Sequence, residues 1–215
     1  MSLVRKSILT VFIVLFLDQA LKIWIKTNMF LYQDIYVLGD WFIIKFIENN
    51  GMAFGIDLPG GYGKLMLTVF RILAAGGIIY YLSVLIKQKV HYGLIVTISL
   101  ILAGALGNIV DSAFYGIIFS DSTPYDKAVL FPPGGGYSSF LHGRVVDMFY
   151  FPVLRGQWPE WIPFKGGHSF EFFRPVFNIA DASITIGVIT IMIFQKKFFG
   201  VAKEVEETSD LTPKT

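Results

Sequence analysis

The sequence predicts an all-α membrane protein with four transmembrane helices, a small β-sheet and long extracytoplasmic loops. Of its 215 residues, 54% are hydrophobic and only 16% are charged, whereas about 25% of the residues of a soluble domain are charged. A spanning helix needs about 20 mostly apolar residues, and four segments meet this requirement: residues 7–25, 65–86, 92–115 and 176–195. We therefore expect one transmembrane domain over residues 1–200 and a polar cytoplasmic tail over residues 201–215.

The distribution of basic residues predicts the orientation of the spans, because lysine and arginine are enriched in cytoplasmic loops. They precede the first span, fill the turn between the second and third, and follow the fourth, at Arg5, Lys6, Lys87, Lys89, Lys196, Lys197 and Lys203. Both termini are then expected in the cytoplasm. The apolar run of the first span is not followed by a small-residue cleavage site, so we interpret this span as a retained anchor.

The two longer connections are expected outside the cytoplasm. Within residues 26–64, two β-prone runs at 35–37 and 41–47 are bounded by turn-forming residues, which predicts a small sheet or hairpin. The second connection, residues 116–175, is rich in Gly, Pro and aromatic residues. Its run 131–136 contains two prolines and three glycines, and we expect it to be irregular.

Polar groups inside a membrane span are costly and are usually functional. In the predicted orientation they gather at the outer ends of the spans, at Asp18 and Lys22, Asn108 and Asp111, and Asn178 and Asp181. Each Asn–Asp pair has i,i+3 spacing and therefore shares one helix face. Asp147 brings a further carboxyl group to this interface, and the inner halves of the spans consist mainly of Ile, Leu, Val, Phe, Gly and Ala. We expect a water-accessible polar cluster at the outer leaflet.

Carboxyl groups are the strongest candidates for catalysis. The absence of Cys excludes thiol nucleophiles and zinc–thiolate sites, and the three His residues lack metal-binding spacing, so we expect no cofactor. The net charge of only +2 comes from scattered basic residues, and nucleic acid is not an expected partner. Two carboxyl groups a few ångströms apart share a proton because both cannot easily ionise. Such a pair can activate water and protonate a carbonyl oxygen, which is peptide hydrolysis by general acid–base catalysis.

Five sequence blocks resemble the motifs of the bacterial lipoprotein signal peptidases, or type II signal peptidases. They occur in the family order: residues 18–22 (DQALK), 49–55 (NNGMAFG), 104–111 (GALGNIVD), 143–147 (GRVVD) and 177–181 (FNIAD). The resemblance implies a multi-pass enzyme of the bacterial plasma membrane with a small extracytoplasmic β-sheet cradle. Its substrate would be a prolipoprotein whose Cys carries diacylglycerol, cut just before that Cys. Its partners would be this precursor and membrane lipids.

The resemblance also implies roles for single residues. The family's catalytic aspartates fall on Asp147 and Asp181. Supporting or substrate-binding roles fall on Asp18, Lys22, Asn49, Gly51, Asn108, Asp111, Arg144 and Asn178. The sequence departs from the family pattern at Ser112, where an Arg is usual, and in two added segments, residues 117–142 and 152–174. We expect the Gly- and Pro-rich segment 117–142 to act as a mobile lid or entrance edge.

Other functions and simpler roles are compatible with these residues. A proton-coupled transporter could use Asp111 and Asp181 as relay acids, but its path would need polar residues at several depths. A non-catalytic scaffold would leave the intramembrane acids unexplained. Asp18 and Lys22 could form only a structural ion pair, and buried asparagines can simply join helices by hydrogen bonds. Cleavage of a lipidated precursor by the purified protein would separate a peptidase from a transporter or scaffold.

Overall fold

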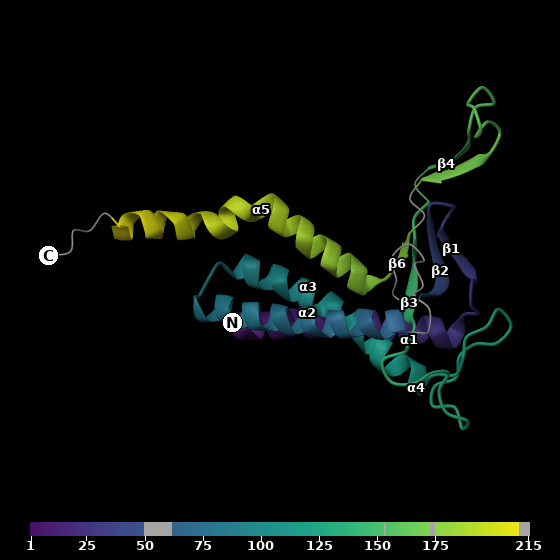
Figure 1. The fold of residues 1–215 in the computed structure, drawn as a ribbon, viewed down its shortest axis with the longest axis horizontal. Coiled ribbons are helices and arrows are strands. Elements are labelled where there is room, and N and C mark those ends of the chain that lie inside the picture. Colours follow the sequence, from purple (N-terminus) through teal and green to yellow (C-terminus); the bar gives the residue numbers. More distant parts are fainter. Residues whose placement is uncertain (50–61, 153, 173–174, 211–215) are drawn as a thin grey trace. The chain divides into compact units, whose positions relative to one another are not determined.

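The computed structural model describes residues 1–49, 62–152, 154–172 and 175–210. The chain forms two compact units, whose elements are labelled in Figure 1. The first unit contains Met1–Asp18, Val69–Ile109 and Ile179–Thr215, and the second contains Gln19–Thr68 and Val110–Asn178. Each unit is therefore assembled from segments that lie far apart in the sequence.

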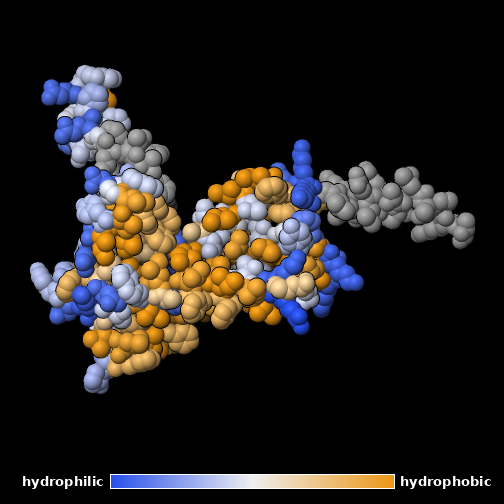
Figure 2. All heavy atoms as spheres, turned by 180° about the vertical axis from the view of Figure 1, so that it is seen from behind, coloured by the Kyte–Doolittle hydropathy of each residue, from blue (hydrophilic) through white to orange (hydrophobic). Residues whose placement is uncertain are grey.

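Long helices dominate the fold: α1 (Leu3–Asn28), α2 (Tyr62–Lys87), α3 (Tyr92–Val110) and α5 (Ile179–Asp210). In the part of the chain that the structure describes, four helical segments are long and apolar enough to cross a membrane, as the sequence predicts. Figure 2 shows apolar side chains over much of the helical surface, and the exposed ones include Phe12, Phe16, Phe70, Leu73 and Met192. A surface of this kind is suited to lipid tails and unfavourable in water.

Two predicted spans have different boundaries in the structure. The third is predicted as a helix over residues 92–115, but α3 ends at Val110 and continues through a π-helical turn, η3 (Asp111–Tyr115), into the short helix α4 (Gly116–Ile118). Such wide turns are frequent at functional sites, and this one begins at Asp111. The fourth span is predicted from residue 176, but α5 begins at Ile179 because Val176–Phe177 form strand β6.

The second unit contains a four-stranded antiparallel sheet in the order β1-β2-β3-β6. Strands β1 (Asp34–Leu38) and β2 (Phe42–Asn49) form the predicted hairpin, and β3 (Val145–Tyr150) places a strand of the second connection beside β2. The turn between β1 and β2 includes Gly39 with φ +52°, a conformation that glycine adopts without steric cost. A second hairpin, β4 (Leu154–Gln157) and β5 (Ser169–Phe172), lies within the second added segment and was not predicted.

Each unit has its own apolar core. In the first unit, Ala75, Leu82 and Leu85 of α2 pack with Leu94 and Ile95 of α3. In the second unit the core combines the end of α1, the sheet and the segment after α4, through Ile25, Met29, Phe46, Tyr115, Phe119, Ala128, Val146 and Met148. Burial of one large apolar side chain contributes about 1.5–3 kcal/mol. The end of α1 is thereby fixed to the sheet.

Candidate active site

Asp147 lies in β3, the strand at the centre of the three that carry the site. Asn49, the last residue of β2, donates from Nδ2 to Asp147 Oδ2 at 2.7 Å, and Asn178, directly after β6, donates from Nδ2 to Oδ1 at 2.7 Å. Because β2 and β6 flank β3, one amide reaches the carboxyl group from each neighbouring strand. Asp147 is buried, so it is not the solvated loop acid that an isolated aspartate in a connection would suggest.

Asp181 lies in the first turn of α5, within the first unit. Its Oδ1 accepts a hydrogen bond from Asn108 Nδ2 of α3 at 2.8 Å. The start of α5 is held by Asp18 of α1, whose Oδ1 accepts from the backbone N–H of Ala180 at 2.9 Å. The first N–H groups of a helix lack partners within the helix, and a carboxylate there also complements the helix dipole. Asp18 therefore acts as a helix cap supplied by another helix.

Two glycines of α3 permit this arrangement. A Cβ at Gly104 would lie 2.2 Å from the carbonyl oxygen of Ala180, and one at Gly107 would lie 2.7 Å from Asp18 Oδ2. Either distance is too short for a real contact, so α3 can approach the start of α5 only because these positions lack side chains. Small residues spaced along an apolar helix are a known signal for close helix packing in membranes. That signal is present in residues 104–107, but it was not used to predict the contact.

Asp111 joins the π-helical turn to α1 and to the sheet. Its Oδ2 forms an ion pair with Lys22 Nζ at 2.8 Å, and both side chains are fully buried. Gln19 Nε2 donates to Oδ1 at 2.9 Å, and the backbone N–H of Val146 donates to Oδ2 at 3.3 Å. Asp111 thus contacts the residue directly before Asp147, which fits the supporting role that the resemblance implies. The sequence did not predict this pairing of Lys22 with Asp111.

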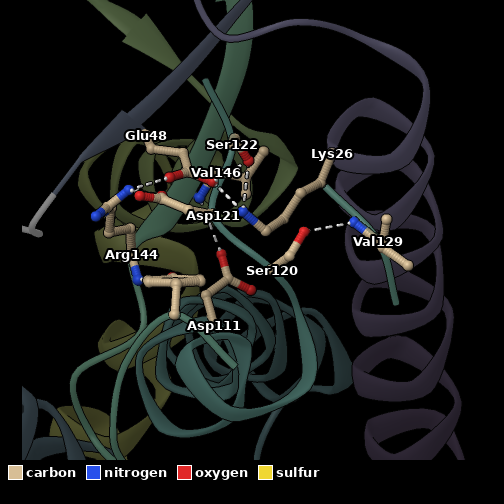
Figure 3. A network of polar contacts seen from close by, with 10 residues as sticks. Lys26, Glu48, Asp111, Ser120, Asp121, Ser122, Val129, Arg144 and Val146 are labelled. Atoms are coloured by element: carbon tan, nitrogen blue, oxygen red, sulfur yellow. Dashed lines mark hydrogen bonds and ion pairs between the residues drawn. The ribbon is translucent and has the colours of Figure 1, made fainter. Parts of the chain in front are cut away.

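Arg144 lies directly before β3 and belongs to a network of charged side chains, drawn in Figure 3. Its Nη1 donates to Glu48 Oε2 at 2.9 Å and to Asp121 Oδ1 at 2.7 Å. Burial lowers the pKa of Arg144, but the hydrogen bonds and charges of Glu48 and Asp121 outweigh burial and raise it. The sequence reasoning missed Glu48, although a carboxyl group directly before Asn49 in the motif block was a visible signal.

The predicted site residues therefore form two groups. The second unit brings Asp147 together with Asn49 and Asn178, and its Asp111 pairs with Lys22. The first unit brings Asp181 together with Asn108 and places Asp18 at the start of the same helix. Each catalytic candidate is held by an amide of its own unit. Gly51 lies outside the described residues.

Comparisons with known proteins agree with one another. Residues 10–197 match the family described as Signal peptidase (SPase) II. A lipoprotein signal peptidase of Porphyromonas gingivalis is 52% identical over 84% of this chain and 78% of its own length. One of Amoebophilus asiaticus is 36% identical over 91% of this chain and 80% of its own.

Two solved structures of bacterial membrane enzymes are also similar to this chain. One bacterial membrane enzyme solved by the in meso method aligns with a TM-score of 0.56 at 29% identity, covering 87% of this chain and 90% of its own. Another aligns with a TM-score of 0.54 at 26% identity, covering 97% of this chain and 93% of its own. The likeness therefore extends over most of the chain.

Proposed function

Because the chain belongs to the signal peptidase II family, a family of proteases that remove signal peptides from prolipoproteins, we propose that it does so as an aspartic endopeptidase with Asp147 and Asp181 as its catalytic pair. The observation that carries this proposal is that asparagine amides donate hydrogen bonds to both carboxyl groups. Asp147 accepts an amide hydrogen bond on each oxygen, and Asp181 accepts one from Asn108. Asn178, which holds Asp147, lies three residues before Asp181 in the sequence.

The proposed reaction needs one shared proton. The ionised aspartate takes a proton from water while the resulting hydroxide attacks the scissile carbonyl carbon, and the protonated aspartate donates to the carbonyl oxygen. When the tetrahedral intermediate collapses, the C–N bond breaks and the leaving amine receives a proton from the pair. The amides of Asn49 and Asn178 keep the Asp147 carboxyl group oriented throughout, because both of its oxygens are held.

The substrate and location are part of the proposal. The precursor would be modified with diacylglycerol on Cys and cut just before that residue, at the outer leaflet of the bacterial plasma membrane. Apolar helix surfaces support this choice, because acyl chains can stay in the bilayer while the peptide reaches the carboxyl groups. The basic residues beside the spans support a cytoplasmic location for both termini.

The test is turnover of a purified lipidated precursor by variants that insert and accumulate normally. Asp147→Asn and Asp181→Asn should each abolish cleavage, because Asn keeps the volume but cannot exchange the proton. Loss of acid–base help alone costs about 10²–10⁴-fold, and the pair also generates the nucleophile. Asp40→Asn, at an exposed turn, is the matched control and should cleave normally. Substantial turnover by either site variant would refute the aspartic mechanism.

A further inference from the structure

The inserted segment 117–142 is packed into the core of the second unit. Phe119 is fully buried, in the same apolar cluster as Phe46 of β2 and Val146 of β3. The backbone N–H of Ala128 donates to the carbonyl oxygen of Lys26 at 3.2 Å, and that of Tyr137 donates to Phe119 at 3.0 Å. The composition predicts a mobile lid, but these contacts fix the segment to α1 and the sheet.

A buried ionic network joins the segment to the sheet (Figure 3). The side chain of Glu48 is 2% exposed. Its Oε1 pairs with Lys26 Nζ and accepts from Ser122 Oγ at 2.9 Å, while its Oε2 accepts from Arg144 at 2.9 Å. Arg144 also binds Asp121, whose side chain is 54% exposed. Two cations are thus balanced by two carboxylates, and Glu48 is the buried carboxylate that contacts both cations.

The ring of Tyr137 completes the packing of the two cations. Lys26 Nζ lies 4.9 Å and Arg144 Cζ 4.7 Å from the ring centroid, within the range of cation–π attraction. The Tyr137 hydroxyl accepts the backbone N–H of Arg144 at 2.6 Å. Burial raises the pKa of Tyr137, so this phenol stays neutral at physiological pH. The inserted segment therefore supplies Ser122, Asp121 and Tyr137 to the network.

Glu48 is also next to a residue of the candidate site. The adjacent Asn49 donates to Asp147, and in the ladder Glu48 lies opposite Val146 and Asn49 opposite Val145. Because successive side chains of a strand point to opposite faces, Glu48 meets the network while Asn49 meets Asp147. The ladder is irregular between Ile44 and Ile47, so the first part of β2 does not by itself fix the register of its end. The contact between Glu48 and Arg144 joins the end of β2 to the start of β3.

We propose that Glu48 is a positioning residue for Asp147, and that segment 117–142 acts as a fixed brace for the two strands. The inference rests on the proposed role of Asp147 in hydrolysis. Without the Glu48 charge, Lys26 and Arg144 lose the buried anion that they share, and the end of β2 is released. Asn49 then no longer holds the Asp147 carboxyl group in its reactive orientation. A single polar or charged residue can specify register in this way.

The experiment compares kcat and KM of Glu48→Gln with those of the wild type, on a lipidated precursor and per mole of folded enzyme. Misplacement of a reacting group by 1 Å can cost about 10²-fold, so kcat should fall about 10- to 100-fold with little change in KM. Asp121→Asn removes another partner of the same guanidinium group, but an exposed one, and should keep kcat within about twofold. Lys26→Met combined with Glu48→Gln removes one charge of each sign and should recover most of the lost kcat.

Hydrogen exchange of the strand amides gives a readout independent of turnover. Amides of β2 and β3 should exchange faster in Glu48→Gln and at the wild-type rate in Asp121→Asn. A wild-type kcat in Glu48→Gln, or no recovery in the double variant, would overturn the proposal. If Glu48→Gln does not accumulate, Glu48→Asp, which shortens the side chain but keeps its charge, should lower kcat with KM unchanged, and a wild-type kcat would refute the idea.

If the proposed function itself were wrong, the experiments would give a different result. A wild-type protein that leaves the precursor intact, or an active Asp147→Asn variant, would remove the premise about Asp147. The exchange measurement would still decide whether Glu48 holds the two strands.

Discussion

Substitution of Gly104 by Ala should separate α3 from the start of α5 and thereby disable Asp181. The added Cβ would lie 2.2 Å from the carbonyl oxygen of Ala180 and 2.7 Å from a side-chain carbon of Ile184, whereas ordinary contacts begin at 3.4 Å. The first obstacle is backbone, so the helices must move apart by about 1.2 Å. Overpacking of this kind costs about 1–3 kcal/mol, and a 1 Å misplacement of a reacting group can cost about 10²-fold in rate.

The assay is thermal unfolding in detergent together with turnover of a lipidated precursor. Gly76→Ala in α2 is the matched control, because no atom lies within 4 Å of its Cβ position. Ala is favoured over Gly in a helix by about 0.5–1 kcal/mol, so the control should unfold at the same or a higher temperature and cleave normally. Gly104→Ala with wild-type stability and turnover would show that α3 and α5 do not pack as closely as this geometry requires.

Three further predictions concern Asp111, the substrate and the orientation. Asp111→Asn should lower stability by about 3–5 kcal/mol, because Lys22 loses a buried ionic partner, and it should retain part of the turnover. Full inactivity at normal stability would give Asp111 a catalytic role instead. A precursor without its lipid should bind far more weakly, since each buried CH₂ contributes about 0.8 kcal/mol, and equal cleavage of both forms would contradict this. A C-terminal reporter that is active only outside the cytoplasm should stay silent, and a signal would reverse the orientation.

The sequence alone was sufficient for the features that depend on local composition. Runs of apolar residues predict the four spans, and β-prone runs separated by turn residues predict the hairpin of β1 and β2. The positions of Asp18, Asn108 and Asp181 near the ends of the spans also predict a polar site. The predictions of the spans and the hairpin succeed because the membrane and the strand period act on each segment separately.

Tertiary structure decided the pairings between distant segments. Only the fold shows that β2 and β6 flank β3 and bring Asn49 and Asn178 to Asp147. Strand order and register depend on packing between segments that are separated in sequence, here by 98 positions for Asn49 and 31 for Asn178. The ion pair between Lys22 and Asp111 joins α1 to the π-helical turn, and no spacing in the sequence predicted it. The glycine- and proline-rich segment 117–142 predicts mobility by composition, yet buried Phe119 and Ser122 hold it on the sheet. Composition reports what a segment can do alone, whereas burial of its few anchoring side chains determines what it does in the fold.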